Sequence, residues 1–191
     1  PGDKRAKEWQ FGELTDAFFQ KSHGHPLHLR YSLLSLQERN LLVNEENVRK
    51  LTGCTHQDIT TYYERLWAKV PIESQTILCL LATCPFPWPP MEILNCLDPS
   101  ASKMSETMSA LAKVRHLLVT DVLGLRPFHD SLLVFVEQTT EYRTYEKKYL
   151  TLVSEWLEKS APAYWKWANE WLVEARLKDS TRLIAGPDRE W

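Results

Sequence analysis

A strand-like segment that runs directly into a helix, within residues 117–135, constrains the fold of this 191-residue chain more than any other feature. Residues 117–122 and 125–128 are mostly apolar and flank Gly124, which predicts a two-stranded hairpin with Gly124 at or near its turn. The apolar run that follows predicts a helix. Because Asp130 directly precedes that run, we expect its carboxylate to cap the amides of the first helical turn.

His129 lies beside this expected cap. The N-terminus of a helix favours an anion, and a phosphate group suits such a position. A histidine at a helix start can therefore be part of a phosphate site. It can equally be an ordinary solvated histidine next to a cap, and the residues of this stretch alone leave both interpretations open.

Three helices are predicted directly before the hairpin. Residues 74–84 are apolar nearly all round, which indicates a central helix, and residues 91–97 and 104–114 carry apolar side chains at helical spacing. A run of prolines between the first two helices predicts an extended turn that holds Phe86 and Trp88 near the core. Three helices followed by a hairpin is the order of a winged helix. The side chains expected to share its core are Ile77, Leu81, Leu94, Met108, Leu111 and Phe128.

An earlier pair of helices is separated by a short turn. Apolar spacing over residues 14–21 predicts a helix with Phe18 and Phe19 at its inner edge. Gly24 then permits a turn, and Pro26 suits the first position of the next helix, where a missing amide costs nothing. The three histidines of this region have no carboxylate or cysteine near them in sequence, so no metal site is expected at His23, His25 and His28.

A polar connector follows over residues 37–57, with a short helix expected around residues 45–51. Residues 55–58 match the [ST]-x-x-[DE] capping pattern, and an amphipathic helix is expected after them. Its aromatic stripe is interpreted as core, because that spacing is typical of a buried helix face. The members of the stripe are Ile59, Tyr62, Tyr63, Leu66, Trp67 and Val70.

The chain after residue 135 is predicted to be helical. One stripe consists of Tyr145, Tyr149, Val153, Trp156 and Leu157, and a helix that starts at Pro162 is expected to bury Tyr164, Ala168, Trp171, Leu172 and Ala175. Such a helical hairpin is typical of the start of a superhelical region. The expected fold is mainly α: a small helical subdomain in residues 1–70, a winged-helix domain with a small β-hairpin in residues 71–140, and a C-terminal helical hairpin in residues 141–191.

Taken together, the turn at residues 24–26 and the Phe-His-Asp of residues 128–130 resemble the STAND branch of signalling NTPases. This group includes bacterial defence ATPases, plant NB-LRR receptors, apoptosome-type adaptors and, more distantly, NACHT proteins. The resemblance implies that Gly24 and Pro26 lie against the adenine of ADP or ATP. It also implies that His129, with Asp130, lies near the β-phosphate of ADP, while Phe128 replaces the usual Met.

The composition of the chain disfavours nucleic acid and membrane surfaces as partners. The chain is 43% hydrophobic and 25% charged, with a net charge of −2 and a pI near 6.4, so no strong attraction to nucleic acid or to a membrane surface is expected. No apolar run approaches the length of a membrane span and no signal sequence is recognised, so a soluble, cytoplasmic protein is expected. Four cysteines without metal-like or redox-like spacing indicate reduced structural thiols: Cys54, Cys79, Cys84 and Cys96.

The phosphate-binding motifs G-x-x-x-x-G-K-[ST] and G-x-G-x-x-G are both absent. We therefore expect no enzymatic activity of this segment and a longer parent ATPase whose nucleotide-binding domain lies upstream. That domain would be its main partner, with protein partners or self-oligomerisation on activation. The alternative is a stand-alone winged-helix adaptor that binds protein or nucleic acid. A hydrolase is disfavoured because no G-x-S-x-G elbow is present.

Overall fold

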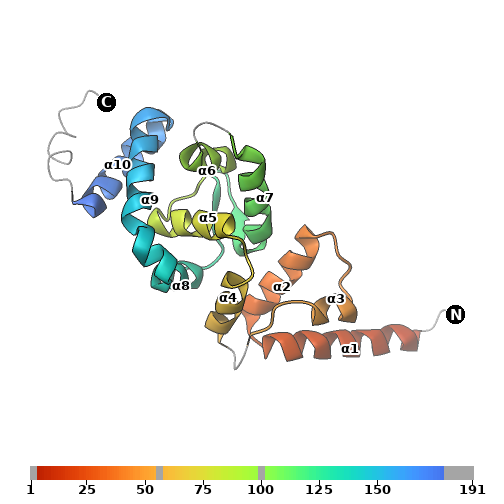
Figure 1. Cartoon of the computed structure of the whole chain (residues 1–191). Helices are drawn as coiled ribbons and strands as arrows, with labels where there is room; N and C mark the ends of the chain where they lie inside the picture. Colours follow the sequence, from red (N-terminus) through yellow and green to blue (C-terminus); the bar gives the residue numbers. More distant parts are fainter. Residues whose placement is uncertain (1–3, 55–57, 99–101, 179–191) are drawn as a thin grey trace. The chain divides into compact units, whose positions relative to one another are not determined.

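The computed structural model describes residues 4–54, 58–98 and 102–178, and only the backbone of residues 4–11. The fold is mainly α with a small antiparallel hairpin, which confirms the expected fold class (Figure 1). The chain divides into two compact units. The N-terminal unit comprises residues 1–70 and 113–117, and the C-terminal unit comprises residues 71–112 and 118–191. The second unit thus includes the range expected as a helical hairpin and most of the range expected as a winged helix, whose residues 113–117 belong to the first unit.

The N-terminal unit contains four α-helices and a short 3-10 helix among the described residues. They are α1 (Lys4–Ser22), α2 (Pro26–Glu38), α3 (Glu45–Arg49), α4 (Ile59–Trp67) and η1 (Arg115–Leu117). Ala17, Leu36 and Val48 bring α1, α2 and α3 together in one apolar cluster. On α4, the stacked and tilted rings of Tyr62 and Tyr63 pack against Tyr31 of α2. The aromatic stripe of α4 therefore contributes to the core, as predicted.

The start of α4 differs from the predicted capping box. Asp58 is the N-cap of α4, and its carboxylate accepts a 2.8 Å hydrogen bond from the amide of Thr60. The pattern places Asp58 inside the helix and Thr55 at the cap, and Thr55 lies outside the described residues. The helix begins later because an aspartate in extended backbone is itself a strong cap. The short helix expected around residues 45–51 is confirmed as α3.

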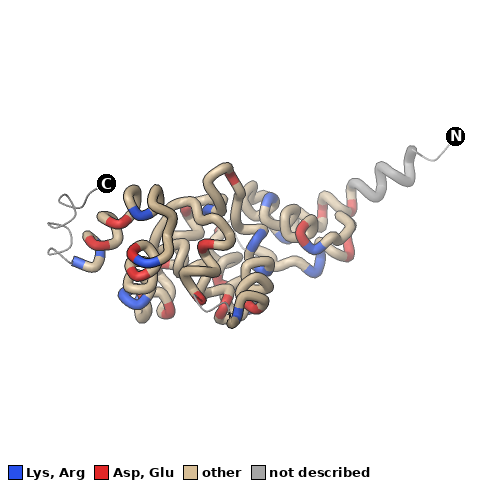
Figure 2. The backbone as a smooth tube through the Cα atoms, turned by 90° about the horizontal axis from the view of Figure 1, so that it is seen from above, with Lys and Arg blue, Asp and Glu red and all other residues tan. Residues whose placement is uncertain are grey.

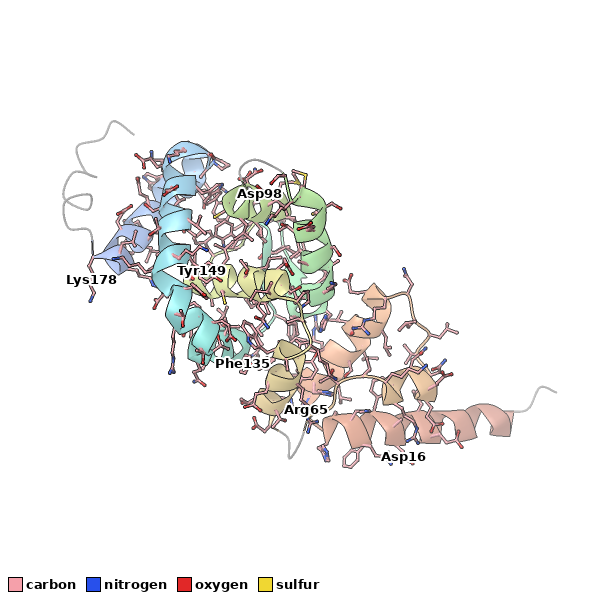
Figure 3. The ribbon with its side chains drawn as sticks, in the orientation of Figure 1. Asp16, Arg65, Asp98, Phe135, Tyr149 and Lys178 are labelled. Carbon is pink, nitrogen blue, oxygen red and sulfur yellow. The ribbon has the colours of Figure 1, made fainter. Side chains whose placement is uncertain are left out.

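The C-terminal unit contains the expected order of three helices and a hairpin, followed by further helices (Figure 1). Its elements are α5 (Ile72–Thr83), α6 (Pro90–Leu97), α7 (Met104–Val114), β1 (Leu118–Thr120), β2 (Leu125–Pro127), α8 (Ser131–Gln138), α9 (Thr140–Lys159) and α10 (Ala163–Leu177). The last two residues of α7 belong to the N-terminal unit. Helix α5 is buried along Ile77–Thr83, which confirms its predicted central place. Figure 3 shows Tyr149 of α9 beside α5.

The proline-rich segment that precedes α6 pairs with strand β2 of the hairpin. Trp88 and Leu125 exchange two backbone hydrogen bonds of 2.7 Å, and the Trp88 side chain is fully buried. Gly124 has φ of 143° at the turn, and a Cβ there would lie only 2.4 Å from the backbone carbon of Trp88. Glycine is therefore required by both the backbone conformation and the close approach of a second chain segment.

One predicted core residue of the winged helix is wrong. Met108 is 46% exposed, whereas Ile77, Leu81, Leu94 and Leu111 are buried and Phe128 is half-buried. The buried stripe of α7 instead consists of Thr107, Ala110, Leu111 and Val114. These positions follow helical spacing, and the small side chains of Thr107 and Ala110 permit close packing on that face.

The predicted inner face of α10 is also wrong. Tyr164, Trp171 and Leu172 are 61%, 58% and 42% exposed, and Ala175 is exposed, while Asn169, Val173 and Glu174 are buried. Two contacts orient the helix: the ring of Trp165 lies 5.2 Å from that of Phe86, and the Ser154 hydroxyl donates a 2.8 Å hydrogen bond to Glu174. A buried carboxylate needs a hydrogen-bond partner, so this polar contact and the ring contact together override apolar spacing. On α9, Tyr145 is likewise half-exposed although the rest of its predicted stripe is buried.

Candidate functional site

The turn at Gly24 has the backbone that the sequence predicts. His23 and Gly24 both have positive φ, 47° and 77°, and the Gly24 amide donates a 3.1 Å hydrogen bond to the hydroxyl of Ser22. Pro26 is the first residue of α2. A left-handed residue between two helices suits glycine because it has no Cβ. The structural part of the prediction for Gly24 and Pro26 is therefore confirmed.

The histidines around this turn have structural roles. His25 is the N-cap of α2, with its Nδ1 3.4 Å from the amide of His28. His28 is buried, its Nε2 donates to the Thr52 carbonyl at 2.8 Å, and burial lowers its pKa. A neutral buried imidazole with a backbone partner is part of the core. Among the described residues, no group of three or more His, Cys, Asp or Glu side chains is arranged to hold a metal ion.

Phe19 is exposed beside the Gly24 turn, which corrects its expected place at the inner edge of α1. Its side chain is 62% exposed, and its Cε2 atom lies 3.7 Å from the position that a Cβ on Gly24 would take. Ala17 is buried and Phe18 half-buried, so Phe19 is one position beyond the inward face. An apolar ring next to an open turn is a surface that a planar base can contact. Sequence spacing alone assigns this ring to the core.

The start of α8 differs from the predicted cap. Asp130 makes no side-chain capping hydrogen bond, and its backbone is already helical, with φ −62° and ψ −23°. An N-cap side chain accepts from the amides two or three residues further along the chain, and it does so from extended backbone, which Asp130 does not have. His129 replaces it: its Nδ1 accepts a 3.1 Å hydrogen bond from the Ser131 amide and lies 2.9 Å from the Ser131 hydroxyl. The prediction that the Asp130 carboxylate caps this helix is wrong.

This arrangement selects one tautomer of the His129 ring. Because Nδ1 accepts from a backbone amide, the proton of the neutral ring is on Nε2. His129 is exposed, and within the described residues its Nε2 makes no hydrogen bond. The ring therefore presents one N–H donor to a ligand. Gly24 and Pro26 belong to the N-terminal unit, whereas His129 and Asp130 belong to the C-terminal unit.

The four cysteines are free and buried, as expected for structural thiols. Burial raises the pKa of the Cys79 and Cys84 thiols to about 12, and it also raises the pKa of Cys54 and Cys96. A thiol is nucleophilic only as its thiolate. These groups are therefore unsuited to nucleophilic catalysis.

Charge is mixed along both units. Figure 2 shows Lys and Arg interspersed with Asp and Glu along the described backbone. The exposed positions of α7, which would enter the major groove in a DNA-binding winged helix, carry Glu106 and Lys113 among small or apolar side chains. This face is close to electrically neutral. No helix of the described ranges has the length and apolar character needed to cross a bilayer.

Comparisons with profiles of known protein families, with curated proteins and with solved structures gave no match.

Proposed function

We propose that this chain is the regulatory segment of a larger STAND-type ATPase that acts in signalling or defence. In this proposal an upstream domain with a phosphate loop holds ADP or ATP. The segment contributes contacts to the bound nucleotide and changes its position when ADP is exchanged for ATP. The nucleotide thus biases a two-state element.

The observation that carries the proposal is the state of the His129 ring. Its Nδ1 is occupied by the Ser131 amide, its Nε2–H is available, and its side chain is exposed at a helix start. A donor of this kind suits a β-phosphate oxygen, and the helix N-terminus adds favourable electrostatics for an anion. Asp130 has no capping role here, so its contribution would be limited to its position beside the ring.

The turn between α1 and α2 supports the adenine side of the proposal. Gly24 has no side chain, Pro26 has a compact one, and the exposed ring of Phe19 lies next to Gly24. Adenine is planar and apolar on its faces, so an aromatic ring and a proline suit it. The near-neutral exposed face of α7 disfavours the alternative of a nucleic-acid-binding adaptor.

The first test is the sequence of the parent polypeptide upstream of residue 1. A G-x-x-x-x-G-K-[ST] motif there is expected, and its absence would overturn the proposal.

The second test is the rate of ADP release from the full-length parent, compared among wild type, His129→Ala and His129→Asn. Asparagine can replace the Nδ1 acceptor through an Asx turn but has no donor at the position of Nε2. Both variants should release ADP faster, by about tenfold or more if one hydrogen bond to a charged group is lost. If His129→Asn releases ADP at the wild-type rate while His129→Ala does not, His129 acts only through the helix start and the nucleotide contact is excluded.

A further inference from the structure

A cavity of about 50 Å³ opens within the N-terminal unit, between α2, the residues after α3, α4 and η1. On the same measure one water molecule needs about 10–15 Å³, so the cavity has room for roughly the four oxygens of a tetrahedral anion. Its polar side chains are Ser32, Ser35, Arg39, Lys50, Tyr62 and His116. Among the described residues, no aspartate or glutamate lines it.

The floor of the cavity is polar and buried. Tyr62 and His116 are 3% and 5% exposed, and the Tyr62 hydroxyl lies 3.2 Å from Nε2 of His116. Ser35 is 6% exposed, yet its hydroxyl makes no hydrogen bond within the part of the chain that the structure describes. The Ser35 hydroxyl therefore has a donor and an acceptor available to a molecule in the cavity.

Two basic side chains, Arg39 and Lys50, lie at the rim of the cavity. Lys50 is ion-paired with Glu46 at 2.6 Å, on the exposed side of α3. Arg39 lines the cavity and makes no ion pair within the described ranges, and its charge acts to lower the pKa of both His116 and Tyr62. A guanidinium has several donors in a fixed plane and suits an oxyanion. Of the two cations in the described lining, Arg39 is thus the one without a carboxylate partner.

We propose that the cavity binds a small tetrahedral oxyanion, either free phosphate or the phosphoryl group of a monoester, with Arg39 as its charged anchor and the Ser35 hydroxyl as a donor. Lys50 also lies at the rim, where Glu46 offsets its charge. The absence of acidic side chains from the described lining disfavours a cation, and the polar floor disfavours an apolar ligand. Gly24, Pro26, His129 and Asp130 do not line this cavity, so the inference is independent of the proposed nucleotide contacts.

Titration calorimetry of the 191-residue chain with inorganic phosphate tests the proposal. Arg39→Gln should weaken binding about tenfold or more, and Ser35→Ala should weaken it several-fold, because each removes a hydrogen bond to a charged ligand. Arg49→Gln is the matched control: it removes the same charge from the same unit, but Arg49 pairs with Glu45 and does not line the cavity. It should change the affinity less than about twofold, as for a screened surface charge. Circular dichroism should show all three variants to be folded.

Two outcomes would overturn the proposal: no binding of phosphate at millimolar concentration, or equal losses for Arg39→Gln and Arg49→Gln, which would indicate attraction to net charge alone. A parallel titration with methyl phosphate distinguishes free phosphate from the phosphoryl group of a monoester as the ligand. If it binds as tightly as phosphate and depends on Arg39, the mouth of the cavity admits a monoester. If phosphate alone binds with that dependence, the ligand is the free anion.

Discussion

The imidazole of His129 accepts a hydrogen bond at Nδ1 from the backbone amide of Ser131, 3.1 Å away, and thereby satisfies the first turn of α8. The neighbouring carboxylate of Asp130, which is the better capping group by residue type, makes no such bond. The helix start thus depends on a ring whose second nitrogen is available to a ligand. Stability and the proposed nucleotide contact are consequently linked at one residue, and variants of that residue must separate them.

Substitutions at the start of α8 should separate these roles. His129→Ala should lower the free energy of unfolding by about 0.5–2 kcal/mol, the range for a lost cap, and His129→Asn should recover most of that loss. Asp130→Ala should change it by less than about 0.5 kcal/mol. Urea unfolding measures all three. A larger loss for Asp130→Ala than for His129→Ala would contradict the hydrogen bonding at this helix start.

Stability should decrease in mild acid because of His116. Burial, with the nearby Arg39 charge, lowers its pKa from 6.5 to about 4. The unfolded chain therefore takes up this proton first as the pH falls. The contribution of His116 is complete above pH 6.5 and is lost as the pH falls toward 4, by at most about 3 kcal/mol.

The control for this prediction is His116→Gln, which retains a hydrogen-bonding group near Tyr62. Its unfolding free energy should depend less on pH between 4 and 6.5 than that of wild type. His28, whose pKa is also lowered, remains in both proteins, so the difference isolates His116. Parallel pH profiles for the two proteins would contradict the prediction.

Truncation of Leu81 should destabilise the protein strongly, whereas truncation of Met108 should not. Leu81 is 1% exposed on α5, so Leu81→Ala should cost about 2–5 kcal/mol through lost burial and the cavity left behind. Met108 is 46% exposed, and Met108→Ala should cost less than about 1 kcal/mol. Chemical denaturation of both variants measures the difference. Similar losses would mean that α7 packs through the face on which Met108 lies.

Alanine substitution at two glycines, Gly124 and Gly12, should change the stability of the protein in opposite directions. Gly124→Ala should destabilise the protein by more than about 1 kcal/mol, because a Cβ would lie 2.4 Å from the Trp88 backbone at a φ of 143°. Gly12 lies in α1, and a Cβ added there would have no neighbouring atom within 4 Å. Gly12→Ala should therefore stabilise the protein by about 0.5–1 kcal/mol. Thermal unfolding checks both signs, and a neutral Gly124→Ala would contradict the close approach of the two segments.

Local patterns in the sequence were sufficient for most of the elements. The apolar run of α5, the proline segment that buries Trp88 and the hairpin around Gly124 are each dictated by short-range chemistry: burial, missing amides and positive φ. The turn at Gly24 and Pro26 was predictable for the same reason. The binding roles of His129, Gly24 and Pro26 stay predictions, because they concern a ligand and not the backbone.

Tertiary contacts decided which face of a helix is buried where apolar spacing in the sequence leaves it ambiguous. Apolar periodicity alone predicts that α10 buries Trp171, yet the packing of Trp165 on Phe86 and the bond from Ser154 to Glu174 rotate that face outward. The cavity beside Arg39 was likewise invisible in the sequence, since it joins α2, α4 and η1 across more than one segment. The chain by itself determines where helices and turns occur, because those depend on neighbouring residues. Which helix face is buried depends on the partners that folding supplies from distant parts of the chain.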